Sequence, residues 1–113
     1  MPRPTSVTIC ESGRVVVQIS PLESHQDFIK LGFNKSENYE NVYLFRSDES
    51  VEVYRMCETL RDLGIPFSTH RILGADYALE VLRNEGFVTG TFKRINFFGN
   101  DRDEDAPYRI EEF

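Results

Sequence analysis

Hydrophobic residues alternate with polar ones near the N-terminus, which is the pattern of strands with one buried face. Val7 and Ile9 begin this alternation, and Val15 and Val17 repeat it after a polar break. Gly13 lies in the break and can adopt the positive φ that a tight hairpin turn requires. The first twenty residues therefore predict a β-hairpin.

Three later segments have apolar residues at the spacing of an amphipathic helix. They cover residues 24–31, 48–63 and 74–86. In the second segment the apolar stripe consists of Val53, Met56, Cys57, Leu60 and Leu63. Each segment ends at a glycine followed by a large apolar residue, as in a Schellman cap. We therefore predict three helices.

Further strands are predicted between and after these helices. Residues 42–46 form a continuous apolar run, which is typical of a strand covered on both faces. Residues 66–73 and 87–98 are the other two candidates, and Gly90 interrupts the second. The order β-β-α-β-α-β-α-β predicts an α+β fold. We expect a single-domain two-layer sandwich with a mixed sheet of about five strands and helices mainly on one face.

The charge of the chain is concentrated near its C-terminal end. The net charge of the 113 residues is −6, and residues 100–113 contribute −4 of it. We therefore expect a globular domain at residues 1–99 and an acidic C-terminal tail at 100–113, docked as an extension. The nearly neutral body provides no general basic field for nucleic acid.

The residues that usually carry catalysis or bind metals are sparse. Cys10 and Cys57 lie within apolar patterns and predict buried, inert thiols. His25 and His70 have no partner at the spacing of a known catalytic motif. The run at residues 100–105 has the acid spacing of a calcium loop, but Ala106 stands where that loop requires glycine. We expect no enzyme activity, no cofactor and no metal.

A nucleic-acid site is the alternative that the sequence leaves open. The phrase ALEVLRNEGFVTGTFKR resembles the helix-to-ribbon joint of winged-helix and some ribosomal proteins. That resemblance implies that Arg83, Lys93 and Arg94 contact phosphate, and Arg71 could join them. In a regular strand, however, Lys93 and Arg94 face opposite sides. The helix before them also carries carboxylates, which would repel phosphate.

A protein-binding surface is the leading hypothesis. The tail places large apolar groups among acids, and these could dock on the chain's own sheet edge or on a partner. The candidate protein-binding residues are Asp101, Asp103, Glu104, Asp105, Tyr108, Glu111, Glu112 and Phe113. We expect a small non-enzymatic interaction or inhibitor module, of the kind found among accessory proteins of phages and mobile elements, that binds a larger protein.

The expected surroundings follow from composition. No apolar run approaches the roughly 18 residues of a membrane span, and no signal peptide is recognisable at the N-terminus. We expect a cytoplasmic protein, without a membrane partner, that is a monomer or a homodimer.

Overall fold

The computed structural model describes residues 4–11, 13–20, 23–69, 74–98 and 107–113. Its strands are β1 (Ser6–Glu11), β2 (Arg14–Gln18), β3 (Asn34–Lys35), β4 (Val42–Arg46), β5 (Phe67–Ser68), β6 (Lys93–Phe97) and β7 (Tyr108–Glu112). Its helices are α1 (His25–Leu31), α2 (Ser50–Asp62) and α3 (Ala75–Asn84). The predicted α+β class is confirmed.

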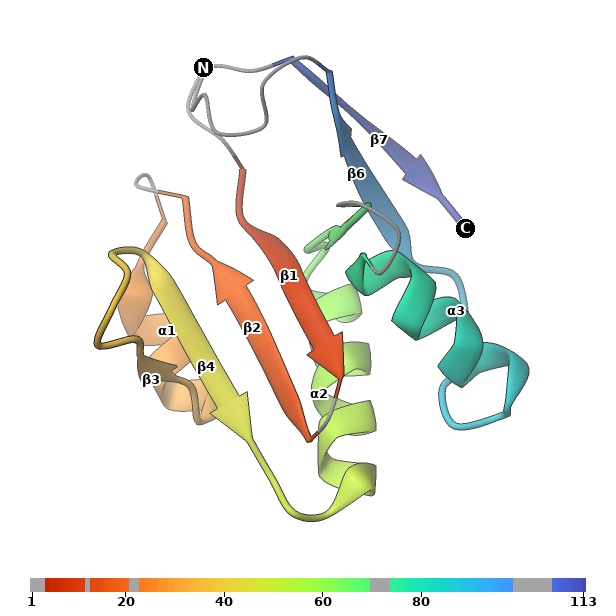
Figure 1. Cartoon of the computed structure of the whole chain (residues 1–113), viewed down its shortest axis with the longest axis horizontal. Coiled ribbons are helices and arrows are strands. Elements are labelled where there is room, and N and C mark those ends of the chain that lie inside the picture. Colours follow the sequence, from red (N-terminus) through yellow and green to blue (C-terminus); the bar gives the residue numbers. More distant parts are fainter. Residues whose placement is uncertain (1–3, 12, 21–22, 70–73, 99–106) are drawn as a thin grey trace.

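The described strands form one mixed sheet in the order β3-β4-β2-β1-β5-β6-β7 (Figure 1). The pairs β1–β5 and β5–β6 are parallel, and the other neighbours are antiparallel. The prediction of about five strands is too low, since the sheet has seven. The two additional strands are β3, which has only two residues, and β7, which lies in the acidic tail.

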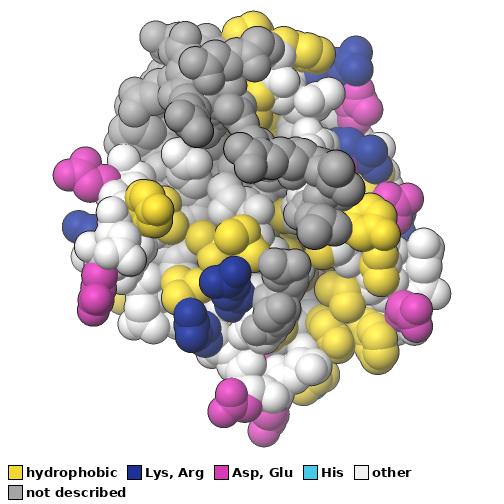
Figure 2. Space-filling view, in the orientation of Figure 1, with side chains coloured by type: hydrophobic (Ala, Val, Ile, Leu, Met, Phe, Trp, Pro, Cys, Tyr) yellow, Lys and Arg dark blue, Asp and Glu magenta, His cyan; other side chains and the backbone are white. Residues whose placement is uncertain are grey.

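The described helices leave one face of β2 and β4 without a helix over it. The core takes residues from all three helices and from the alternate strand positions that face them. On the other face, Val16 and Leu44 lie opposite each other and are only half-buried. Figure 2 shows hydrophobic and basic side chains together on this open face. The expectation that strand 42–46 is covered on both faces is therefore wrong, because the described helices cover β4 on one face only.

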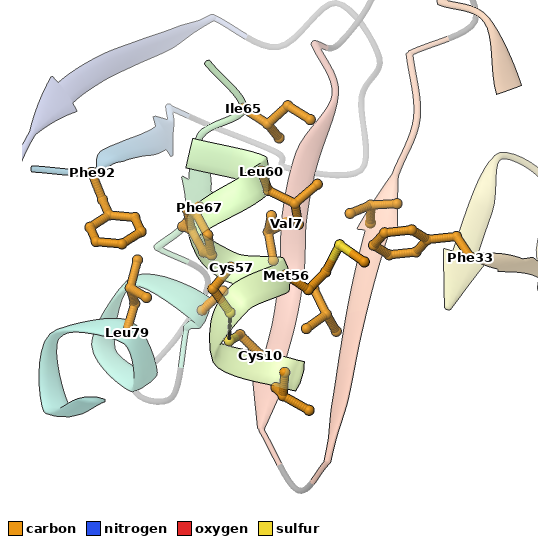
Figure 3. Close-up of a cluster of buried hydrophobic side chains, with 14 of the residues drawn as sticks. Val7, Cys10, Phe33, Met56, Cys57, Leu60, Ile65, Phe67, Leu79 and Phe92 are labelled. Atoms are coloured by element: carbon orange, nitrogen blue, oxygen red, sulfur yellow. Dashed lines mark hydrogen bonds between the residues drawn. The ribbon is translucent and has the colours of Figure 1, made fainter. Parts of the chain in front are cut away.

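The core is built where α2 and α3 meet the central strands. Met56 and Leu60 of α2 point toward β1 and β2, while Phe92 and Leu79 close the side next to α3 (Figure 3). Leu60, Leu79 and Phe92 have no exposed surface. Burial of such side chains contributes about 1.5–3 kcal/mol each.

Glycine ends α2 as the sequence predicts, but the predicted apolar stripe is one residue too long. Gly64 has φ +79°, and the Ile65 N–H donates to the Leu60 carbonyl oxygen at 3.1 Å, which is Schellman geometry. Leu63 is 59% exposed because the helix ends at Asp62 and the chain then reverses.

The last predicted strand is also shorter in the structure. Residues 87–92 precede β6, which begins at Lys93. Gly90 has φ +96°, a conformation that interrupts an extended strand. A Cβ atom at this position would lie 2.7 Å from a guanidinium nitrogen of Arg61.

Candidate functional site

An apolar groove lies between the N-terminal half of α2 and α3. Its volume is about 420 Å³. Val53 and Tyr54 line it from α2, Tyr77 and Val81 line it from α3, and Cys10 of β1 also borders it. We call this feature the α2–α3 groove.

Exposed hydrophobic side chains cluster around this groove. Tyr77 is 53% exposed and Val81 is 40% exposed, and both are groove-lining residues. Phe87 is exposed to a similar extent, and its ring stacks on the groove-lining Tyr54 with 5.0 Å between centroids. In Figure 2, hydrophobic side chains gather over the region of α3. Exposed apolar surface gathered in this way is typical of binding sites.

Three carboxylates lie on α3 or directly after it. Glu80 and Glu85 are exposed and follow Tyr77 and Val81 by three and four positions. Asp76 lies in the first turn of α3, where its Oδ1 accepts the Tyr77 N–H at 2.8 Å. Burial raises the pKa of Asp76 above its usual value. Glu80 and Glu85 are therefore the exposed carboxylates that lie nearest in sequence to the groove-lining residues Tyr77 and Val81.

Two buried thiols meet beneath the groove. The sulfur atoms of Cys10 and Cys57 are 2.8 Å apart, and both residues are buried (Figure 3). The contact with Cys10, together with burial, raises the pKa of the Cys57 thiol far above its usual range. Cys57 therefore stays protonated and is a poor nucleophile.

The described part of the predicted protein-binding tail lies on the sheet. Tyr108, Glu111 and Glu112 belong to β7, which pairs with β6, and all three are exposed. Phe113 packs against the core, and its backbone N–H and oxygen bond to Phe92 at 2.9 and 3.1 Å. The candidates Asp101, Asp103, Glu104 and Asp105 lie outside the described residues.

Two of the predicted phosphate-contacting arginines contact Phe113. An Arg83 guanidinium N–H donates to the Phe113 backbone oxygen at 2.7 Å. The Arg94 guanidinium lies 4.3 Å from the centroid of the Phe113 ring and 3.8 Å from an Asp76 carboxylate oxygen. Both arginines therefore help to hold the end of β7 in place.

The other predicted phosphate contacts do not join this cluster. Lys93 is exposed and paired in register with Glu112, on the face of β6 opposite to Arg94. Arg71 lies outside the described residues. A role of these four residues in binding nucleic acid stays a prediction.

A different pair of basic residues meets at the end of β2 and β4. Arg14 and Arg46 are direct cross-strand partners between these two strands. Like charges in this arrangement repel, while on its other side Arg14 is paired in register with Glu11. Both line a hollow that also includes Ser47 and Asp48.

The remaining candidates for catalysis or metal binding do not come together as a group in the described part of the chain. His25 Nδ1 lies 3.1 Å from the Tyr43 hydroxyl, and the two rings meet edge to face. No group of three potential metal ligands occurs among the described residues. His70 and the run at residues 100–105 fall outside them. Of the helices in the described ranges, none has the length and apolarity to cross a membrane.

Comparisons of the chain with protein-family models, curated proteins and solved structures find no match.

The sequence did contain a signal for the groove. Tyr77 and Val81 are large apolar residues that line the groove and lie off the buried stripe of α3. The sequence prediction emphasised the buried stripes and the tail, and so missed the surface between the two helices.

Proposed function

We propose that this protein is a non-enzymatic interaction module that binds an amphipathic helix of a larger protein in the α2–α3 groove. The observation that carries the proposal is the exposure of Tyr77 and Val81 in the wall of one apolar groove, with the exposed ring of Phe87 stacked on groove-lining Tyr54. Occupation of a partner's surface in this way is how an inhibitor or accessory protein would act.

The shape and charge of the groove define the partner. Two neighbouring helices leave a channel for the apolar stripe of a third helix, the helix-in-groove mode of recognition. Glu80 and Glu85 beside the α3 wall favour a partner with lysine or arginine flanking that stripe. The partner is therefore a basic amphipathic helix.

The test uses a fluorescent peptide of leucine and lysine whose leucines lie at i, i+3, i+4 and i+7. Val81→Asp places a charge in the groove at an exposed position, so the fold is retained and binding weakens by about tenfold or more. Ile29→Asp is the matched control, because Ile29 is 46% exposed on α1 and does not line the groove.

A second peptide of the same composition, with leucine and lysine alternating, controls for non-specific attraction between opposite charges. Weaker binding of this peptide is expected, since its leucines do not form one helical stripe. Equal binding of both peptides, or equal binding by wild type and Val81→Asp, would overturn the proposal.

Nucleic-acid binding is the second candidate, supported by the cross-strand pairing of Arg14 with Arg46. A phosphate between the two guanidinium groups would relieve their repulsion. Binding of labelled single-stranded and duplex DNA at two salt concentrations tests this candidate. Binding at low salt that is lost in Arg14→Gln/Arg46→Gln supports it, and no binding at low salt rules it out.

A further inference from the structure

We propose that two copies of this chain form a symmetric dimer by antiparallel pairing of β7 with β7. The strand lies at the edge of the sheet, and all five of its residues are exposed. No described strand pairs with its outer side. An exposed edge strand of this kind is a template for a further strand.

The hydrogen bonds of β7 with β6 define which backbone groups are free. Phe92 and Phe113 exchange both N–H···O bonds, and the Phe98 N–H donates to the Pro107 oxygen at 2.8 Å. Because such pairs alternate along an antiparallel ladder, odd-numbered residues of β7 direct their backbone groups toward β6. The even-numbered residues therefore direct theirs to the open edge, and these are Tyr108, Ile110 and Glu112.

These three outward-directed residues are symmetric about Ile110. Pairing of Ile110 with Ile110 of a second copy would place Tyr108 opposite Glu112 on each side, so that every outward backbone group is used. If Ile110 were opposite residue 109 or 111 of the second copy, its free backbone groups would face groups already bonded to β6. Hydrogen bonds between the two copies form only when each even-numbered residue of β7 lies opposite an even-numbered residue of the other copy.

Side-chain charge selects one register among those that remain. With Ile110 at the centre, Arg109 of each copy lies opposite Glu111 of the other, where cross-strand Cα atoms are about 4.5 Å apart. These two residues lie on the same face of β7, since Arg109 Nε is 2.6 Å from Glu111 Oε1 within one chain. Centring on residue 109 would oppose two arginines, and centring on residue 111 would oppose two glutamates. The strand is therefore self-complementary in one register only.

The first test blocks the edge. Ile110→Pro removes the outward N–H without touching the bonds to β6, and proline is tolerated on edge strands in this orientation. We expect wild type to associate into dimers as its concentration rises in sedimentation velocity, and Ile110→Pro to stay monomeric with an unchanged circular dichroism spectrum. A monomeric wild type across the concentration range, or equal association of folded Ile110→Pro, overturns the proposal.

The second test shows whether the charges at positions 109 and 111 meet between chains. Arg109→Glu and Glu111→Arg should each be monomeric, because each places like charges opposite each other in a homodimer. An equimolar mixture of the two variants should form a heterodimer, since both contacts between position 109 of one copy and position 111 of the other then join a glutamate to an arginine. A mixture that stays monomeric while wild type dimerises would contradict this register. The mixing result depends on contacts between chains, which separates it from any effect of the Arg109–Glu111 contact within one chain.

Discussion

At the scale of single residues, Asp76 shows how burial sets a protonation equilibrium. Its side chain is only 14% exposed, and burial outweighs both the Tyr77 N–H and the Arg94 guanidinium in raising its pKa. The folded protein therefore binds this proton more tightly than the unfolded chain does. The stability that the proton contributes is lost as the pH rises from about 4, the usual aspartate pKa, through the raised value.

Substitution of Asp76 by asparagine should remove this loss. Urea denaturation at each pH gives the free energy of unfolding of wild type and of Asp76→Asn. The wild-type value minus the Asp76→Asn value should fall as the pH rises across that window. Asp62→Asn, at a carboxylate that is 71% exposed, is the control and should keep the profile of wild type. A difference between wild type and Asp76→Asn that stays constant or rises with pH would refute the assignment.

At the scale of elements, β7 is held by its end as well as by its ladder. Phe113 packs beside Phe92 with ring centroids 6.4 Å apart, and the guanidinium groups of Arg83 and Arg94 lie over its ring at 5.4 and 4.3 Å. The arginines are thus part of the packing of an edge strand.

Truncation of Phe113 should therefore destabilise the fold. Phe113→Ala should lower the free energy of unfolding by about 2 kcal/mol, less than the roughly 3–5 kcal/mol of a fully buried phenylalanine. Tyr39→Ala provides a control at an aromatic residue that is 69% exposed, and should change stability by about 0.5 kcal/mol or less. Equal urea midpoints for the two variants would show that Phe113 does not anchor β7.

At the scale of the whole molecule, local sequence patterns predict the individual helices and strands better than they predict how the strands pair and the helices pack. The hairpin, the three helices and the reversal at Gly64 follow from alternation, helical spacing and glycine conformation, and each acts within a few residues of sequence. The strand at residues 108–112 is missing from the predicted sheet, because its acids are typical of a solvated tail. Its place depends on the pairing with β6 and on the contact of Arg83 with Phe113, thirty residues away.

The α2–α3 groove belongs to the same scale, since it exists only where two helices pack on one sheet. Val53 and Tyr54 line it from α2, and Tyr77 and Val81 line it from α3, so the pattern within either helix alone shows only one wall. The site residues that the sequence singled out lie elsewhere, near β6 and β7 or outside the described ranges. Function by this account comes from a surface that folding assembles rather than from a motif.

The most direct test of this account is a map of amide chemical shifts in isotope-labelled protein titrated with the leucine–lysine helical peptide. Binding in the groove predicts that the largest shifts fall in residues 50–54 and 77–82, and that Val81→Asp reduces them at a peptide concentration near the wild-type Kd. Largest shifts on the open face of β2 and β4, or no shifts at a concentration that saturates binding of the fluorescent peptide, would contradict the central claim.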